Sequence, residues 1–265
     1  MTGAGGADYD PAPLGGRAGR PQMRIAILSD IHANLEALVQ VEAALARLGV
    51  DRVMCCGDVV GYGASPNACC ERIRDLASVT LLGNHDAAVA GRMEYDYYYD
   101  AARQALDWTA RQLDPDHMVW LRSLPYTHRA DEVCFSHGSP ILPGEYGYVF
   151  ALEQAQELVP HLGRLAPVTF IGHSHLCKAF ALGQGEVDDV TAPVLQLEPD
   201  RKYILSVGSV GQPRDYDNRA CFVTYDTEQR RVEYHRVAYD IEGSARRIFD
   251  AELALNFGKR LFLGV

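Results

Sequence analysis

The first third of the chain alternates short apolar runs with stretches in which apolar residues recur at helical spacing. Each apolar run predicts a buried strand, and each helical stretch predicts a helix, the first of them capped by Asn34. The predicted strands are 23–28, 52–56 and 79–82, and the helices between them are 35–48 and about 67–76. Strand, helix and strand in this order predict right-handed parallel crossovers within one sheet.

The pattern changes after residue 95, where the segment 95–124 predicts a helical insert. Later apolar runs predict mostly strands, with a helix near 151–159 and a closing helix at about 242–257. The expected strands are 126–129, 132–135, 168–171, 178–182, 194–197, 203–207, 220–225 and 231–239. We expect the strands of the second half to form a second sheet packed on the first. This arrangement is an α/β (α+β) fold in which two mixed β-sheets form a sandwich flanked by helices.

Residues 1–22 are rich in glycine, alanine and proline and have no periodic apolar pattern, so we predict that they form a flexible leader. A hydrophobic content of 48% in 265 residues is enough to bury a sizeable core. We expect 23–265 to form a single domain that includes the helical insert.

Charge and cysteine usage exclude several classes of protein. The formal net charge of −10 argues against binding to nucleic acid or to anionic membranes, which both reward an excess of Lys and Arg. The seven cysteines are odd in number and have no C-x-x-C spacing, which favours a reducing compartment over a disulfide framework. No apolar run approaches the roughly 20 residues of a membrane span, and no signal peptide is visible. We therefore expect a cytoplasmic protein and leave homo-oligomerisation open.

Polar clusters follow five of the predicted strands, at the edge where open α/β sheets place their ligands. They offer carboxylates, imidazoles and one amide, with no thiolate, and this mixture suits Mn, Fe, Zn or Co better than copper or calcium. Seven donors exceed one tetrahedral site but suit two ions that share a carboxylate. The candidate ligands are Asp30, His32, Asp58, Asn84, His137, His173 and His175.

Each of these residues also has a purely structural interpretation. Asp30 and Asn84 could cap helices, Asp58 could belong to a turn, and Asp86 could cap the helix that follows it. Five such coincidences in one chain are improbable together, so the set favours a metal centre. The tyrosines at 95–99 are either a packed amphipathic surface or the wall of a pocket.

The same motifs resemble the five signature blocks of the calcineurin-like metallophosphoesterase superfamily, in that family's order. The blocks are Asp30-x-His32, Gly57-Asp58-x-x-Gly61, Gly83-Asn84-His85-Asp86, His137-Gly138 and Gly172-His173-Ser174-His175. The branch that the chain is most similar to contains the small bacterial predicted phosphodiesterases with a YfcE-like layout. The segment 208–215 is similar to a late motif of that branch, although Ser206-Val207 stands where Asn-Pro is common.

The resemblance implies a role for each residue of the blocks. Asp30, His32 and His175 would hold one divalent ion, and Asn84, His137 and His173 a second, with Asp58 between them. The implied metals are Mn, Fe, Zn, Co or Ni, with Mn favoured for activity, and a bridging hydroxide would attack the phosphoester. His85 would be a general acid or a clamp on the transition-state charge, and Asp86 would orient it and keep it protonated.

The expected reaction is hydrolysis of a small phosphoester, as a phosphodiesterase or a broad-specificity phosphoesterase. Phosphoprotein and dinucleoside polyphosphate phosphatases of the superfamily carry an arginine shortly after the block-two aspartate, and here that stretch reads Val59 to Gly63 without one. Those activities remain the alternatives, and a non-catalytic metal-binding regulatory module is the alternative of another class. Arg214 would bind the substrate phosphate or pair with Asp215, and Arg92 could supply a further phosphate donor.

Overall fold

The computed structural model describes residues 23–183 and 185–265, so the predicted leader lies outside the described residues. The strands are β1 (Arg24–Leu28), β2 (Arg52–Cys55), β3 (Val79–Thr80), β4 (Thr127–Ala130), β5 (Val133–Ser136), β6 (Val168–Ile171), β7 (Cys177–Leu182), β8 (Val187–Asp189), β9 (Val194–Gln196), β10 (Lys202–Val207), β11 (Ala220–Asp226) and β12 (Arg231–Val237). The α-helices are α1 (Leu35–Leu48), α2 (Pro66–Leu76), α3 (Asn84–Val89), α4 (Asp100–Gln112), α5 (Pro115–Ser123), α6 (Leu152–Gln156), α7 (Ile241–Asp250) and α8 (Leu255–Leu263). Two short 3₁₀ turns are Pro143–Glu145 and Val159–His161.

Two six-stranded mixed sheets form the sandwich, as predicted. The first has the order β3-β2-β1-β11-β12-β9 and the second β4-β5-β6-β10-β7-β8. The prediction that the strands of the second half form the second sheet was wrong for three of them. β11 returns to the first sheet and pairs antiparallel with β1, and β12 and β9 extend that sheet. Every residue of β11 is buried, which suits a strand in the middle of a sheet with both faces covered.

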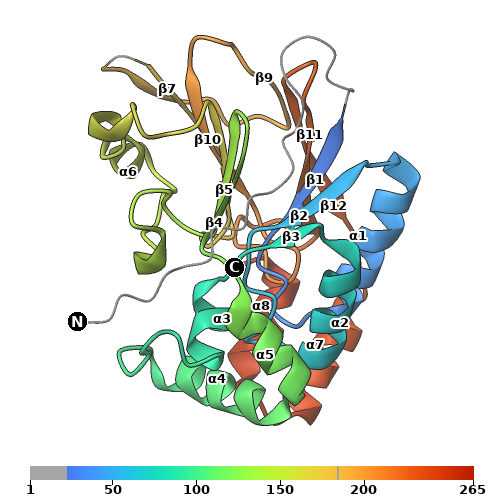
Figure 1. Ribbon diagram of the computed structural model, residues 1–265. Coiled ribbons are helices and arrows are strands. Elements are labelled where there is room, and N and C mark those ends of the chain that lie inside the picture. Colours follow the sequence, from blue (N-terminus) through green and yellow to red (C-terminus); the bar gives the residue numbers. More distant parts are fainter. Residues whose placement is uncertain (1–22, 184) are drawn as a thin grey trace, which may run out of the picture.

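Apolar cores lie between the two sheets and on the outer face of each, and a further cluster joins α4, α7 and α8. Figure 1 shows α1 and α6 on opposite outer faces of the sandwich. Ile27 and Val223 of the first sheet pack against Phe135, Phe170 and Leu205 of the second. On the outer face of the first sheet, a second core joins the strands to α1 and α2. On the outer face of the second sheet, α6 covers a third core around Phe180. The helices therefore flank the sandwich and leave the carboxyl ends of the parallel strands free to carry polar side chains.

Two helical predictions need correction. The closing helix is not continuous: α7 ends at Asp250, Glu252 takes a left-handed backbone with φ of 57°, and α8 folds back against α7. The reversal is packed tightly, because a Cβ at Gly258 would lie 2.5 Å from the Phe249 ring. In the insert, the tyrosine segment 95–99 is a set of turns, and α4 begins only at Asp100.

Candidate metal centre

The seven predicted ligands converge at one end of the sandwich. Asp30 and His32 follow β1, Asp58 follows β2, and Asn84 is the first residue of the helix after β3. His137 follows β5, and His173 and His175 lie between β6 and β7. Backbone hydrogen bonds tie the first two loops together, from Asp30 N to Gly57 O (2.9 Å) and from His32 N to Asp58 O (3.0 Å).

The loops that carry these residues are held in an unusual backbone conformation. Five of the seven residues have φ between 47° and 67°, a region that residues other than glycine seldom occupy: Asp30, His32, Asp58, His173 and His175. Such strain persists only where the surrounding structure enforces it, and it gathers at functional sites. Tight packing helps to enforce this backbone conformation. A Cβ atom added at Gly83 would lie 2.1 Å from Asp58 Oδ1, and one added at Gly172 would lie 1.8 Å from Ser29 Oγ.

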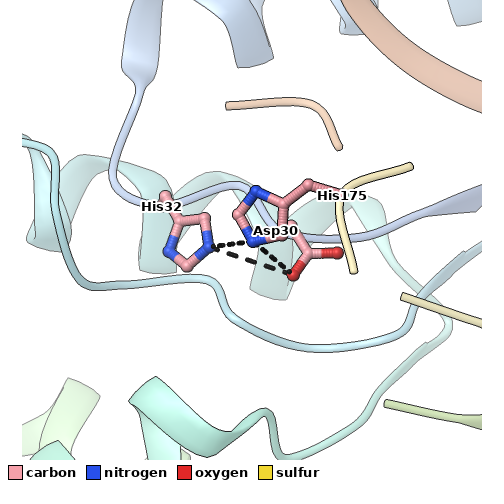
Figure 2. Close-up of side chains that lie close together, drawn as sticks. All are labelled: Asp30, His32 and His175. Atoms are coloured by element: carbon pink, nitrogen blue, oxygen red, sulfur yellow. Dashed lines mark hydrogen bonds and ion pairs between the residues drawn. The ribbon is translucent and has the colours of Figure 1, made fainter. Parts of the chain in front are cut away.

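One group of donors consists of Asp30, His32 and His175 (Figure 2). His32 Nε2 lies 3.1 Å from His175 Nε2, and Asp30 Oδ1 lies 3.3 Å from His175 Nε2 and 3.9 Å from His32 Nε2. All three side chains are buried. Their ring nitrogens and carboxylate oxygen face a common point, as the ligands of one cation do.

A second group consists of Asp58, His137 and His173, and Asn84 adjoins it. Asp58 Oδ2 lies 3.3 Å from His137 Nε2, and Asn84 Oδ1 lies 3.0 Å from the same nitrogen. Asp58 Oδ2 is also 3.7 Å from His32 Nε2 of the first group. Asp58 therefore lies between the two groups and can contribute to both.

Hydrogen bonds to backbone carbonyls orient three of the imidazoles. The Nδ1 atoms of His32, His137 and His175 lie 3.2, 2.8 and 2.6 Å from the carbonyl oxygens of Val60, Cys56 and Gln212. A carbonyl accepts only, so these contacts place the proton on Nδ1 and leave the Nε2 lone pair directed at the donor group. This arrangement is typical of histidines that bind a metal.

The electrostatics of the cluster fit divalent cations. Asp30 Oδ1 and Asp58 Oδ2 are buried, and neither has a hydrogen-bond partner within the described residues. Burial raises the pKa of Asp30 to about 7 and lowers that of His173 to about 3. Burial also opposes ionisation of Asp58, but the imidazoles of His137 and His85 outweigh it and hold its pKa well below the usual range. At His137 burial is outweighed by the Asp58 carboxylate, which raises the pKa of that imidazole to about 9, so a proton on His137 supplies positive charge that a bound metal ion would replace.

His85 borders both the donor groups and a cleft, but the predicted pairing with Asp86 is wrong. The Asp86 carboxylate accepts hydrogen bonds from the backbone N–H groups of Val59 (3.2 Å), Val60 (3.1 Å) and Gly83 (3.2 Å). His85 Nδ1 is buried without a hydrogen-bond partner in the described residues, and burial lowers the pKa of this imidazole to about 4. Asp86 therefore caps the start of its own helix through Gly83, as the capping interpretation expects, and it also fixes the loop after Asp58.

Tyr98 is a site residue that the sequence alone did not identify. Its Oη accepts a hydrogen bond of 2.6 Å from Asn84 Nδ2, which turns Asn84 Oδ1 toward the donor group. The only sequence signal was the run of tyrosines at 95–99. The pocket-wall alternative describes Tyr97 to Tyr99, whereas Tyr95 packs against the core and donates to Asp107. Tyr97, Tyr98 and Tyr99 line a cleft of about 510 Å³ whose lining includes Asn84 and His85.

Tyr98→Phe is expected to raise the Kd of one of the two proposed metal ions by about 10- to 100-fold. The substitution removes the hydroxyl that accepts a hydrogen bond from Asn84 and orients its side chain. Calorimetric titration of the metal-depleted protein with Mn measures the effect. Tyr97→Phe is the matched control, because the Tyr97 hydroxyl bonds Met93 Sδ instead of Asn84. Equal Mn affinities in the two variants would show that Tyr98 does not position Asn84.

The predictions for the two arginines have different outcomes. Arg214 does not pair with Asp215, whose carboxylate forms an ion pair with Arg236. Arg214 lies near the cleft instead, with Cζ 5.8 Å from the Tyr62 ring centroid, and Tyr62 in turn packs 4.4 Å from the His85 ring. Arg92 is occupied elsewhere, since it donates to Leu124 O at 2.6 Å and covers the Tyr126 ring.

None of the helices in the described part of the chain combines the length and apolarity that a bilayer crossing requires.

Comparisons with known proteins identify the family of the chain. The family model of the calcineurin-like phosphoesterase superfamily domain matches residues 23–230. An uncharacterised protein of Methanocaldococcus jannaschii is 36% identical over 244 residues, which are 91% of this chain and 98% of that protein.

Solved structures show the same fold. The crystal structure of a metallophosphoesterase from Sphaerobacter thermophilus is 36% identical with a TM-score of 0.80, over 92% of this chain and 100% of that one. A hypothetical protein from Pyrococcus horikoshii is 17% identical with a TM-score of 0.73, over 91% and 98%. Structural neighbours at lower similarity include the phosphoesterase YfcE from E. coli (16% identical over 82% of this chain and 100% of that one, TM-score 0.42). The chain belongs to the calcineurin-like phosphoesterase superfamily.

Proposed function

We propose that the protein hydrolyses phosphoester bonds of small molecules with two divalent cations, as a phosphodiesterase or a broad-specificity phosphoesterase. The observation that carries the proposal is the position of Asp58, whose Oδ2 faces His137 at 3.3 Å and His32 at 3.7 Å. Asp30, His32 and His175 would hold one cation, and Asn84, His137 and His173 the other. Of the metals that suit this donor set, Mn is favoured for activity.

When bound, the two cations supply an acidified water as the nucleophile and neutralise the charge of the phosphoester group. The chain's own residues hold and orient the substrate. Asp86 holds the loop after Asp58 through two backbone N–H groups, so that the carboxylate stays between the two donor groups. His85 reaches the substrate from the cleft side. As a neutral imidazole it donates an N–H hydrogen bond to the transition-state charge, or, once an anionic phosphoester beside it raises its pKa, a proton to the leaving oxygen.

A diester preference is supported by the lining of the cleft. No arginine follows Asp58 within the loop that ends at Gly63, and Arg92 is bound to the insert. Among the described residues, the lining of the cleft itself contains no arginine, and Arg214, which lines a neighbouring hollow, is proposed as a guanidinium that binds the substrate away from the reacting phosphate. A phosphomonoester dianion needs more cationic partners than a diester monoanion, so this lining favours the diester.

Hydrolysis of bis-p-nitrophenyl phosphate and of p-nitrophenyl phosphate, each with added Mn, tests the proposal. We expect turnover of both, with the higher kcat/KM for the diester. Two equivalents of bound metal without turnover of either compound would contradict the enzyme proposal and favour the non-catalytic metal-binding module. Faster turnover of the monoester would favour the phosphatase alternatives. A cytoplasmic location remains part of the proposal, and homo-oligomerisation is left open.

A further inference from the structure

The cleft over the metal centre is larger than a phosphate group needs. Its volume is about 510 Å³, and Asn84, His85 and His173 are among its lining residues. Cavities of this size hold drug-sized ligands and bury most of their surface. The cleft therefore has room for a sizeable organic group attached to the phosphoester.

Exposed tyrosines make up much of the cleft wall. Tyr97 is 74% exposed, Tyr99 56% and Tyr148 49%, although such rings usually lie in a core or an interface. One face of Tyr148 is already stacked on His173, with 4.0 Å between ring centroids. Aromatic rings gathered around one cleft provide stacking surfaces for a flat ligand, whatever its exact hydrogen-bonding groups are.

A second hollow of about 360 Å³ adjoins the cleft, since Tyr62, Tyr99 and Tyr148 line both. Arg214 and Arg260 line this second hollow, and both donate to Gln212 Oε1, at 2.8 and 3.4 Å. Within residues 23–183 and 185–265, neither guanidinium has a carboxylate within ion-pair distance. Two neighbouring guanidinium groups without a carboxylate, in a chain of net charge −10, are a candidate anion site.

The two hollows differ in charge, which assigns them different parts of a ligand. Glu145 lines the tyrosine cleft, so a second anion is disfavoured there and a neutral aromatic group is favoured. The arginine hollow, in contrast, favours an anionic group. Candidate metal ligands line only the tyrosine cleft, which Asn84 and His173 border, and the arginine hollow is joined to it through Tyr62, which lines both hollows and packs against His85.

We propose that the substrate is a phosphodiester that also carries a flat aromatic group and a second anionic group. The aromatic group would lie against Tyr97, Tyr99 and Tyr148, and the second anion between Arg214 and Arg260. A nucleotide with a further phosphate has this chemistry. The inference rests on the proposed function and specifies its substrate class.

Binding measured by isothermal titration calorimetry, in which affinity is the readout in place of turnover, tests both parts. The probe is thymidine 3′,5′-bisphosphate with the Mn-loaded protein. Two matched compounds each lack one feature: thymidine 5′-phosphate lacks the second phosphate, and the tetrahydrofuran bisphosphate lacks the base. We expect each loss to weaken binding about tenfold. Equal affinities for the three compounds would overturn the proposal.

Variants assign each feature to its hollow. Tyr97→Leu is expected to abolish the tenfold advantage of the base and keep that of the second phosphate, whereas Arg260→Met should do the reverse. The matched controls are Tyr216→Leu, an 86% exposed tyrosine outside both hollows, and Arg103→Met, an arginine paired with Asp100 on α4. Control variants that reduce the two advantages as much as Tyr97→Leu and Arg260→Met would also overturn the proposal.

Hydrolysis of two p-nitrophenyl diesters separates this inference from the proposed function, because both release the same leaving group. Equal kcat/KM for methyl p-nitrophenyl phosphate and thymidine 5′-(p-nitrophenyl phosphate) would overturn the substrate class and keep the enzyme. Hydrolysis of neither, with the binding differences intact, would overturn the proposed enzyme and keep the ligand class. We expect the thymidine ester to have a kcat/KM about tenfold higher.

Discussion

Replacing His85 by alanine is expected to lower kcat by about 100- to 10,000-fold while two equivalents of metal stay bound. His85 lines the cleft, and its ring centroid lies 4.9 Å from that of His32. Each donor group nevertheless has a carboxylate and two imidazoles without it. The measurements are kcat with bis-p-nitrophenyl phosphate and Mn, and metal content by mass spectrometry after gel filtration.

The alternative to be excluded is that His85 is itself a ligand. One of its ring nitrogens forms a cluster with donor atoms of His32 and Asp58, all within 4.8 Å of one another. A loss of metal in His85→Ala as large as in Asp58→Ala would identify it as a ligand and contradict the proposed role.

The leaving group distinguishes the two remaining roles of His85. If it protonates the leaving oxygen, the His85→Ala penalty should be larger for methyl phenyl phosphate than for methyl p-nitrophenyl phosphate, because phenolate is the more basic leaving group. If it stabilises charge on the phosphoryl group, the two penalties should be equal. This comparison is needed because the Asp86 carboxylate accepts backbone N–H groups and not the His85 ring. Within the described residues, no carboxylate partner therefore identifies His85 as the acid.

The convergence of the candidate ligands was predictable because it follows from topology. Parallel strands end at the same edge of a sheet, so polar residues after β1 and β2 must come together. The same argument holds for β5 and β6 in the second sheet. The packing of one sheet on the other then brings His137 and His173 to Asp58.

Other features depend on contacts that a local pattern does not encode. A buried run such as β11 can pair in either sheet, so its place beside β1 could not be derived from apolarity. The turn between α7 and α8 contains no glycine or proline to mark it. The hydrogen bond between Tyr98 and Asn84 joins two segments whose relative placement depends on the whole insert.

Asp86 shows how one sequence supports two interpretations. An aspartate in the first turn of a helix accepts backbone N–H groups and also stands next to the preceding histidine in sequence. Neighbours in a helix point about 100° apart, so adjacency in the motif does not place the two side chains in contact. In the structure Asp86 contacts the loop of Val59 and Val60, far along the chain.

Asp58→Ala is expected to abolish turnover and most of the thermal stabilisation that Mn gives the protein. The change removes Oδ2, which faces both donor groups, and it also removes Oδ1, which accepts the His85 backbone N–H at 2.8 Å. For the wild type, Mn at 100 times its Kd stabilises the fold by about 2.7 kcal/mol for each site. Melting temperatures with and without Mn measure this difference directly. Asp189→Ala, which removes a carboxylate paired with Lys178 at the edge of the second sheet, is the control and should keep the full Mn-dependent shift. An unchanged shift in Asp58→Ala would mean that the two groups bind metal independently, and it would overturn the shared carboxylate on which the dinuclear proposal rests.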